Sequence, residues 1–220
     1  VFRSLVKHQA SDRLDPILMT GSTVLVDDDL SERFLERAVQ WVKERGLQVT
    51  FKDQVHDGYH EIHGRGKHWV PRYYSLMITE LFQEGFTKCL VGTRGLLGEG
   101  WDASRINVLV DMTTVTTSMS INQLRGRSIR LDKEWKEKVA NNWDIVCVAD
   151  EFTKGFDDYQ RFKEKHKQLY GVCDDGAIER GVGHVHAAFN DVRPEGISEG
   201  MGMFNEEMIR RAMSRDHTRQ

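Results

Sequence analysis

Short apolar runs that alternate with amphipathic helical stretches constrain the fold of this chain more than any other feature. The runs predict buried strands over residues 23–29, 47–51, 88–93, 106–112 and 143–149. Strands that are apolar throughout are typical of a parallel sheet covered by helices on both faces. The pattern therefore predicts an α/β domain with three layers and a central, mostly parallel sheet.

The stretches between these runs carry helix signals. Residues 31–46 place apolar side chains on one face, with Ser31 as the expected N-cap and Gly46 as the stop. Residues 71–85 begin with Pro71 and end at a glycine, as helices often do. Further helices are expected over residues 117–128, 157–171 and 205–214.

The organisation along the chain follows from where this pattern holds. We expect a lead-in segment over residues 1–20, an α/β domain over 21–170 and a glycine-rich extension over 171–220 that ends in a helix. A chain of 220 residues is long enough to bury a sizeable core. Because the sequence starts at Val1, we expect it to be part of a longer protein.

Composition excludes several classes of protein. No apolar run is long enough to span a bilayer and no signal-peptide pattern is present, so we expect a cytoplasmic protein without a membrane partner. The three cysteines show no paired spacing, which favours buried free thiols over disulfides or metal ligands. A net charge of −3 argues against a broad basic surface for duplex DNA but allows a narrow basic track.

Two segments carry the candidate chemistry. The stretch "LVGTRGLLGEGWDA" (90–103) runs from a strand into a loop with four glycines, and "QLRGRSIR" (123–130) sets three arginines close together without a carboxylate. Glycine loops let backbone N–H groups approach a ligand, and a carboxylate at the loop's end can accept from a ribose hydroxyl. Arginines without internal partners suit a phosphoryl group. The two segments together describe half of a nucleotide site.

In this order the segments resemble the second RecA-like lobe of superfamily 2 (DEAD/DEAH-like) helicases. "TVLVDD" is similar to motif IV, "VGTRGLLGEGWD" to motif V, and "QLRGRSIR", with its Gln-x-x-Gly-Arg-x-x-Arg pattern, to motif VI. The match covers residues 23–130. It implies a RecA-like fold and an ATP-dependent motor that acts on DNA or RNA.

The resemblance also implies roles for individual residues. Arg127 and Arg130 would act as arginine fingers toward the γ-phosphate of ATP, supported by Gln123. The residues expected near the nucleotide are Gly100, Asp102 and Gly126. The residues expected to contact nucleic acid are Thr93, Arg94, Arg125, Lys67 and Trp69.

ATP and Mg²⁺ would be held mainly by a first RecA-like lobe of the same parent protein. The chain has no Gly-x-x-x-x-Gly-Lys-Ser/Thr phosphate loop, so we do not expect this part alone to hydrolyse ATP. Two other classes stay open. One is a binding module that grips nucleic acid or a protein without using ATP, and the other is the motor part of a restriction-type nuclease.

Four histidines fall in the polar stretch over residues 52–70, at positions 56, 60, 63 and 68. Their spacing fits no closed zinc pattern, so we predict no metal site. A solvated loop is the simplest interpretation. The alternative is a single-strand contact, because basic and aromatic side chains such as Lys67 and Trp69 are interleaved there.

Overall fold

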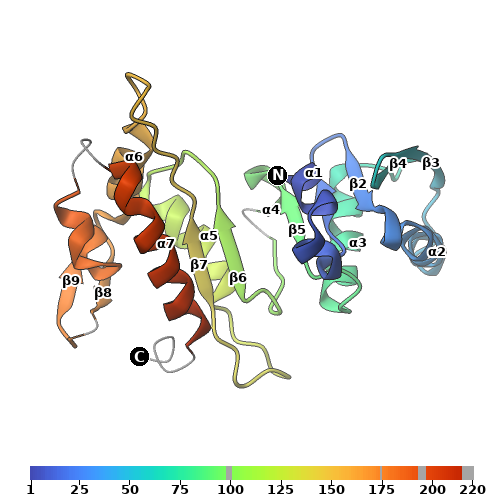
Figure 1. Ribbon diagram of the computed structural model, residues 1–220. Coiled ribbons are helices and arrows are strands. Elements are labelled where there is room, and N and C mark those ends of the chain that lie inside the picture. The colour runs from blue at the N-terminus through green and yellow to red at the C-terminus, as the bar shows by residue number, and fades with distance from the viewer. Residues whose placement is uncertain (98–100, 174, 193–196, 215–220) are drawn as a thin grey trace. The chain divides into compact units, whose positions relative to one another are not determined.

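The computed structural model describes residues 1–97, 101–173, 175–192 and 197–214 (Figure 1). The chain divides into two compact units, Val1–Ala103 and Ser104–Gln220. The boundary falls inside the stretch 21–170, which the sequence pattern predicts to be one domain. Each unit combines helices with strands, so the predicted α/β class is confirmed.

The first unit is built on a sheet of five strands in the order β3-β4-β2-β1-β5. Only β1 and β5 are parallel, and the other neighbours in this sheet are antiparallel. The prediction of a mostly parallel sheet is therefore wrong. The strands are β1 (Ile17–Met19), β2 (Val24–Asp27), β3 (Thr50–His56), β4 (Tyr59–Arg65) and β5 (Leu90–Gly92).

The hairpin of β3 and β4 explains most of this error. The fourteen residues of its two strands occupy much of the polar stretch that is predicted to be a solvated loop. A tight turn, in which Gly58 has φ +82°, joins the two strands. The strand predicted over 47–51 begins only at Thr50 and extends to His56. Strand β3 can be polar because it lies at the edge of the sheet and its side chains are exposed or only partly buried, whereas β4 buries Tyr59 and Ile62.

Helices pack against both faces of this sheet, since Tyr59 of β4 contacts Phe2 whereas Ile62, three residues on, faces the core of the unit. They are α1 (Phe2–Lys7), the 3₁₀ helix η1 (Gln9–Leu14), α2 (Asp28–Glu44), α3 (Pro71–Gln83) and the short α4 (Arg94–Leu97). The core packs α2 and α3 against β1, β2 and β4 through buried side chains such as Phe34, Trp41 and Met77.

Most predicted helix ends in this unit are correct. Pro71 lies at the first turn of α3, and Gly46 and Gly85 follow α2 and α3 with φ of +63° and +80°. The N-cap prediction for Ser31 is wrong. Helix α2 begins earlier because the Asp27 carboxylate accepts a hydrogen bond from the Asp29 amide at 3.2 Å.

The second unit contains a parallel pair of strands, β6 (Val108–Asp111) and β7 (Asn141–Asp144). Helix α5 (Ser118–Ser128) follows β6, and α6 (Asp157–His166) follows β7. Strand β7 is shorter and lies earlier than the predicted run over 143–149, since it ends with Asp144 opposite Asp111 of β6. Helix α6 ends at His166 because Tyr170 already begins another strand.

The remainder of the second unit packs around a small aromatic core. Tyr159 and Phe162 of α6 contact Val182 and Phe189. The elements that complete this unit are the hairpin β8 (Tyr170–Val172) and β9 (Ile178–Arg180), the 3₁₀ helices η2 (Gly181–His184) and η3 (Ala187–Asn190), and α7 (Ile197–Met213). The predicted C-terminal helix is thus present, and it starts earlier than expected.

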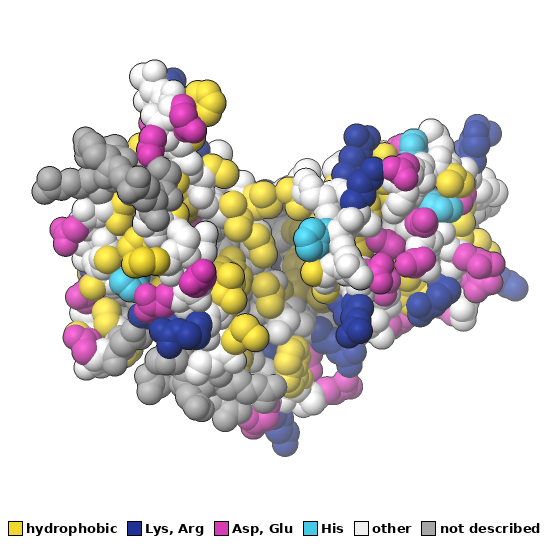
Figure 2. All heavy atoms as spheres, in the orientation of Figure 1, with side chains coloured by type: hydrophobic (Ala, Val, Ile, Leu, Met, Phe, Trp, Pro, Cys, Tyr) yellow, Lys and Arg dark blue, Asp and Glu magenta, His cyan; other side chains and the backbone are white. Residues whose placement is uncertain are grey.

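One side of strand β6 is exposed. Val108 and Val110 alternate along β6 and are about half exposed, and Met112 continues the row. Figure 2 shows hydrophobic side chains gathered on the visible side of the second unit where β6 lies. The other face of the pair carries charged side chains that contact α5 and α6.

Two composition-based expectations can be compared with the structure. All three cysteines are free, as predicted, but Cys147 is exposed and Cys89 and Cys173 are only partly buried. Among the described residues, no helix combines the length and apolar character needed to cross a membrane.

Candidate functional site

Helix α5, which carries the motif VI-like residues, is fixed to the sheet along one side. Ile121, Arg125 and Ser128 follow each other at intervals of four and three residues, so they share a helix face. Ile121 and Ser128 are buried. Arg125 Nη2 lies 2.6 Å from Asp144 Oδ2, and Ser128 Oγ donates to Asn142 Oδ1 at 2.7 Å. Both partners are on β7.

The predicted catalytic residues lie roughly on the opposite side of α5. Gln123, Arg127 and Arg130 have the same spacing of four and three residues, and Gln123 follows Ile121 by about half a turn. Arg130 lies just after the helix, where Ile129 keeps a helical conformation with φ −84°. Gln123 is exposed, Arg130 is half-buried, and Arg127 is only 9% exposed.

Gly126 lies between these two sides of the helix. A Cβ atom at this position would meet no heavy atom within 4 Å. The packing of the chain itself therefore gives no steric reason for a glycine here.

A buried cluster of charged side chains, which we call the α5 anchor, surrounds the Arg125–Asp144 pair. Lys165 Nζ lies 2.9 Å from Asp111 Oδ2 and 3.3 Å from Asp144 Oδ1, and His166 Nε2 lies 3.1 Å from Asp144 Oδ2. The expectation that the arginines of "QLRGRSIR" lack partners within the chain is thus wrong: all three have interactions there, and Arg125 is bound to Asp144. Sequence reasoning missed this because the partner, nineteen residues downstream, is brought in by the pairing of β6 with β7.

The protonation states within the α5 anchor follow from its burial and its charges. Burial works against the charged form of Asp144, but the His166 hydrogen bond and the charges of Arg125 and Lys165 outweigh it, so that its pKa falls to about 2. Burial, together with the nearby cations, lowers the pKa of His166 despite its contact with Asp144. At neutral pH Asp144 is therefore ionised and the His166 imidazole is neutral.

The motif V-like residues lie in the first unit, at the start of α4. The Thr93 carbonyl accepts hydrogen bonds from the amides of Leu96 and Leu97, so Thr93 begins this short helix. Thr93 and Arg94 are both exposed. Gly100 lies outside the described residues. Asp102 is exposed and follows Trp101, whose indole N–H donates to Thr79 Oγ1 at 2.7 Å.

Lys67 and Trp69 lie between β4 and α3 and differ in exposure. Lys67 is exposed, whereas Trp69 is partly buried and packs against the core of the first unit. Its ring meets Phe51 edge-on at 5.4 Å between centroids and Tyr74 at 5.1 Å. These contacts give Trp69 a packing role in this structure.

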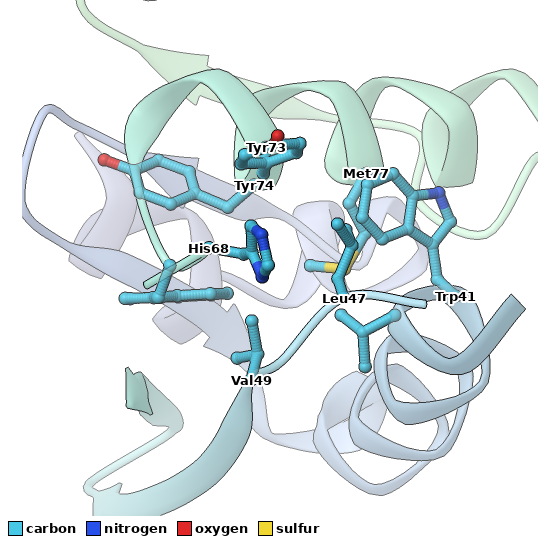
Figure 3. A pocket seen from close by; sticks show the side chains of 9 residues that line it. Trp41, Leu47, Val49, His68, Tyr73, Tyr74 and Met77 are labelled. Carbon is cyan, nitrogen blue, oxygen red and sulfur yellow. The ribbon is translucent and has the colours of Figure 1, made fainter. Parts of the chain in front are cut away.

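The cavity beside Trp69 is too small for a nucleotide. Its free volume is about 10 Å³, which suffices for one water molecule. Figure 3 shows His68 directed into it between α3 and the start of β3. The His68 Nδ1 atom accepts a hydrogen bond from the Gln48 amide at 2.9 Å, so the imidazole closes the cavity from one side.

The other histidines of the polar stretch are held on the β3–β4 hairpin. His60 Nδ1 lies 2.7 Å from Asp53 Oδ2, and His56 stacks on Tyr59 with 4.8 Å between ring centroids. The expectation of a solvated loop is therefore wrong. In the part of the chain that the structure covers, no group of three or more His, Cys, Asp or Glu residues is arranged to hold a metal ion.

Asp27, at the end of the motif IV-like strand, provides a pH-dependent prediction. Burial, together with neighbouring carboxylates, raises its pKa to about 6, and the Asp29 hydrogen bond only partly offsets this. Between pH 4 and 6 the folded state binds more protons than the unfolded state, so this group makes stability fall as the pH rises. We expect Asp27→Asn, which keeps an N-cap acceptor, to raise the free energy of unfolding by about 1–3 kcal/mol at pH 8.

Urea titrations of the wild type and Asp27→Asn at pH 8 and at pH 4 would measure this effect. The gain should vanish at pH 4, where Asp27 is already protonated in the folded state. Asp57→Asn is a suitable control because that carboxylate is exposed on the surface. An equal gain at both pH values would show that charge burial is not the cause.

Comparisons of this chain with protein-family models, with curated proteins and with solved structures found no significant match.

Proposed function

We propose that this chain is the second motor lobe of an ATP-dependent DNA or RNA helicase or translocase, with a RecA-like arrangement. The observation that carries the proposal is the two-sided character of α5. One side is anchored to β7, while Gln123, Arg127 and Arg130 share the other. A fixed helix that sets Gln123, Arg127 and Arg130 on one side suits a phosphate whose charge develops during transfer, once Arg127 is uncovered.

In this proposal a first lobe of the parent protein binds ATP and Mg²⁺. The present chain is the second lobe, and its residues complete the nucleotide site. Arg130 is partly exposed, whereas the buried Arg127 has to be uncovered before it can contact a phosphate. Closure of the two lobes around ATP would supply that change. The open space beside Gly126 allows a ligand or the partner lobe to approach the helix backbone closely.

The proposed nucleic-acid contacts come from exposed groups of the first unit. Thr93 and Arg94 lie at the start of α4, and Lys67 follows β4. Arg125 does not belong to this set, since its guanidinium is bound to Asp144. Asp102, exposed after Trp101, is placed near the ribose in this proposal, and Trp69 supports the core.

One observation favours a second candidate function. The burial of Arg127 would be expected in a lobe that grips nucleic acid or a protein and never contacts ATP. Such a binding module would keep the motif VI-like helix only as a packed element of the fold.

ATP hydrolysis by the full-length parent protein, measured with and without single-stranded DNA or RNA, tests these candidates. The motor proposal expects ATP turnover that at least one of the two polynucleotides stimulates. Nucleic-acid binding without any ATP turnover would overturn it and leave the binding module.

A further inference from the structure

The α5 anchor has a geometry that fixes the rotation of the helix as well as its position. Arg125 and Ser128 lie three residues apart and contact Asp144 and Asn142, which are two residues apart on β7. A single contact would let the helix turn about it. Two polar contacts, together with the buried side chain of Ile121, prevent the helix from rotating about its axis.

The buried charges around Arg125 and Asp144 make a rotation of α5 energetically unfavourable. The side chains of Asp111, Asp144, Lys165 and His166 are each at most 7% exposed, and that of Arg125 is 17% exposed. If α5 turned away, Asp144 would lose one of its two cations in a buried setting. Removing one partner of a buried ion pair is strongly destabilising because the other charge is left uncompensated.

We propose that Arg125 and Asp144 are positioning residues that hold α5 in the orientation required by its opposite side. A helix residue two positions after Arg125 lies about 200° around the axis, so the orientation of Arg125 fixes that of Arg127. The orientation of Arg125 also fixes the directions in which Gln123 and Arg130 leave the helix axis. The catalytic consequence rests on the proposed motor function, whereas the anchoring of α5 does not.

The test compares Arg125→Met, Arg125→Lys and the control Arg161→Met in the full-length protein. Arg161 forms an ion pair with Asp158 on the surface of α6, so its replacement removes a cation and a salt bridge outside the anchor. Two quantities are measured at a temperature where all variants are folded. They are the amide hydrogen-exchange rates of residues 118–128 and the kcat and KM of stimulated ATP hydrolysis.

We expect Arg125→Met to accelerate exchange in α5 by at least about tenfold, as for a locally opened element. We expect its kcat to fall by about 10- to 100-fold with a KM for ATP within about threefold, because a misplaced catalytic group slows chemistry. Arg125→Lys should give intermediate values, since it keeps the charge but loses the planar guanidinium. Arg161→Met should match the wild type in both measurements.

Asn142→Ala provides a second variant should Arg125→Met fail to fold. It removes the contact to Ser128 without changing any charge, and we expect a smaller change in the same direction. Unchanged exchange in α5 would overturn the anchoring. Faster exchange with unchanged kcat would overturn the positioning role. Absence of ATP turnover in the wild type would instead count against the motor function, and the exchange rates would then decide the anchoring alone.

Discussion

Replacing Arg127 by alanine in the full-length protein should lower the kcat of nucleic-acid-stimulated ATP hydrolysis by about 10³-fold or more. A supplied arginine contributes about 10³ to 10⁵ in rate in well-studied nucleotide hydrolases, because it stabilises charge that develops only in the transition state. Binding of ATP should change little, since the phosphate loop and the Mg²⁺ site belong to the first lobe. Steady-state kinetics and an equilibrium binding measurement with ATP separate the two effects.

The variants Arg127→Lys and Arg161→Ala are the controls for this prediction. Lysine keeps the charge but lacks the fork of donors, so it should recover only part of the activity. Arg161→Ala removes a surface cation of the same unit and should keep full activity. Because Arg127 is buried, the folded fraction of each variant has to be measured under the assay conditions. ATP turnover within tenfold of the wild type would remove Arg127 from the proposed site.

The helices were the part of this fold that sequence patterns predicted best. The expected helix over 117–128 is α5 almost to the residue, and Pro71, Gly46 and Gly85 mark real helix ends. The helix prediction also predicts that Gln123, Arg127 and Arg130 lie together. Once the segment is helical, their spacing alone puts them on one side.

The sheet was predicted poorly because some of its strands are apolar and buried whereas others are polar and partly exposed. Apolar runs predict strands buried on both faces, but β3 and β4 are polar and form an antiparallel hairpin at the sheet edge. Strand β1 has only three residues and directly follows Pro16, which leaves too short a pattern to recognise. The exposed row of Val108 and Val110 shows that an apolar strand need not be covered on both faces.

The α5 anchor could not be predicted because its charges come from elements that are distant in sequence. Arg125 lies on α5, Asp111 and Asp144 end two parallel strands, and Lys165 and His166 end α6. In the sequence the segment 123–130 contains no acid, and the first one downstream is Asp132. The register that pairs Asp111 with Asp144 supplies the acids, and that register is a tertiary property.

Removing the carboxylate at the centre of the α5 anchor should have the largest effect on stability. We expect Asp144→Ala to lower the free energy of unfolding by about 3–5 kcal/mol, because Arg125 and His166 lose their acceptor and Lys165 keeps only Asp111. Urea-induced unfolding, followed by circular dichroism, measures the change. Glu164→Ala is the matched control, since that carboxylate forms only an exposed pair with Lys167 and should cost less than about 1 kcal/mol.

Acidification tests the same anchor without a mutation. The lowered pKa of His166 means that the unfolded state binds an extra proton once the pH falls below about 6.5, so this group's contribution to stability is lost from that point downward. The pKa of Asp144, about 2, adds a second loss as the pH falls below about 4. The groups that face His166 are Arg125, Asp144, Lys165 and His184, and burial lowers the pKa of His184 as well, which adds to the first loss.

The Asp144→Ala variant should show a weaker loss of stability below pH 4 than the wild type, because the carboxylate responsible for it is gone. Its loss of stability should still begin near pH 6.5, because the unfolded state sets that onset, but it should continue to lower pH and become larger, since removing Asp144 lowers the pKa of His166 in the folded state further. Stability measured as a function of pH for both proteins decides this. Parallel curves would mean that the carboxylate does not control the protonation of its neighbours, and the anchor would then be held by packing rather than by charge.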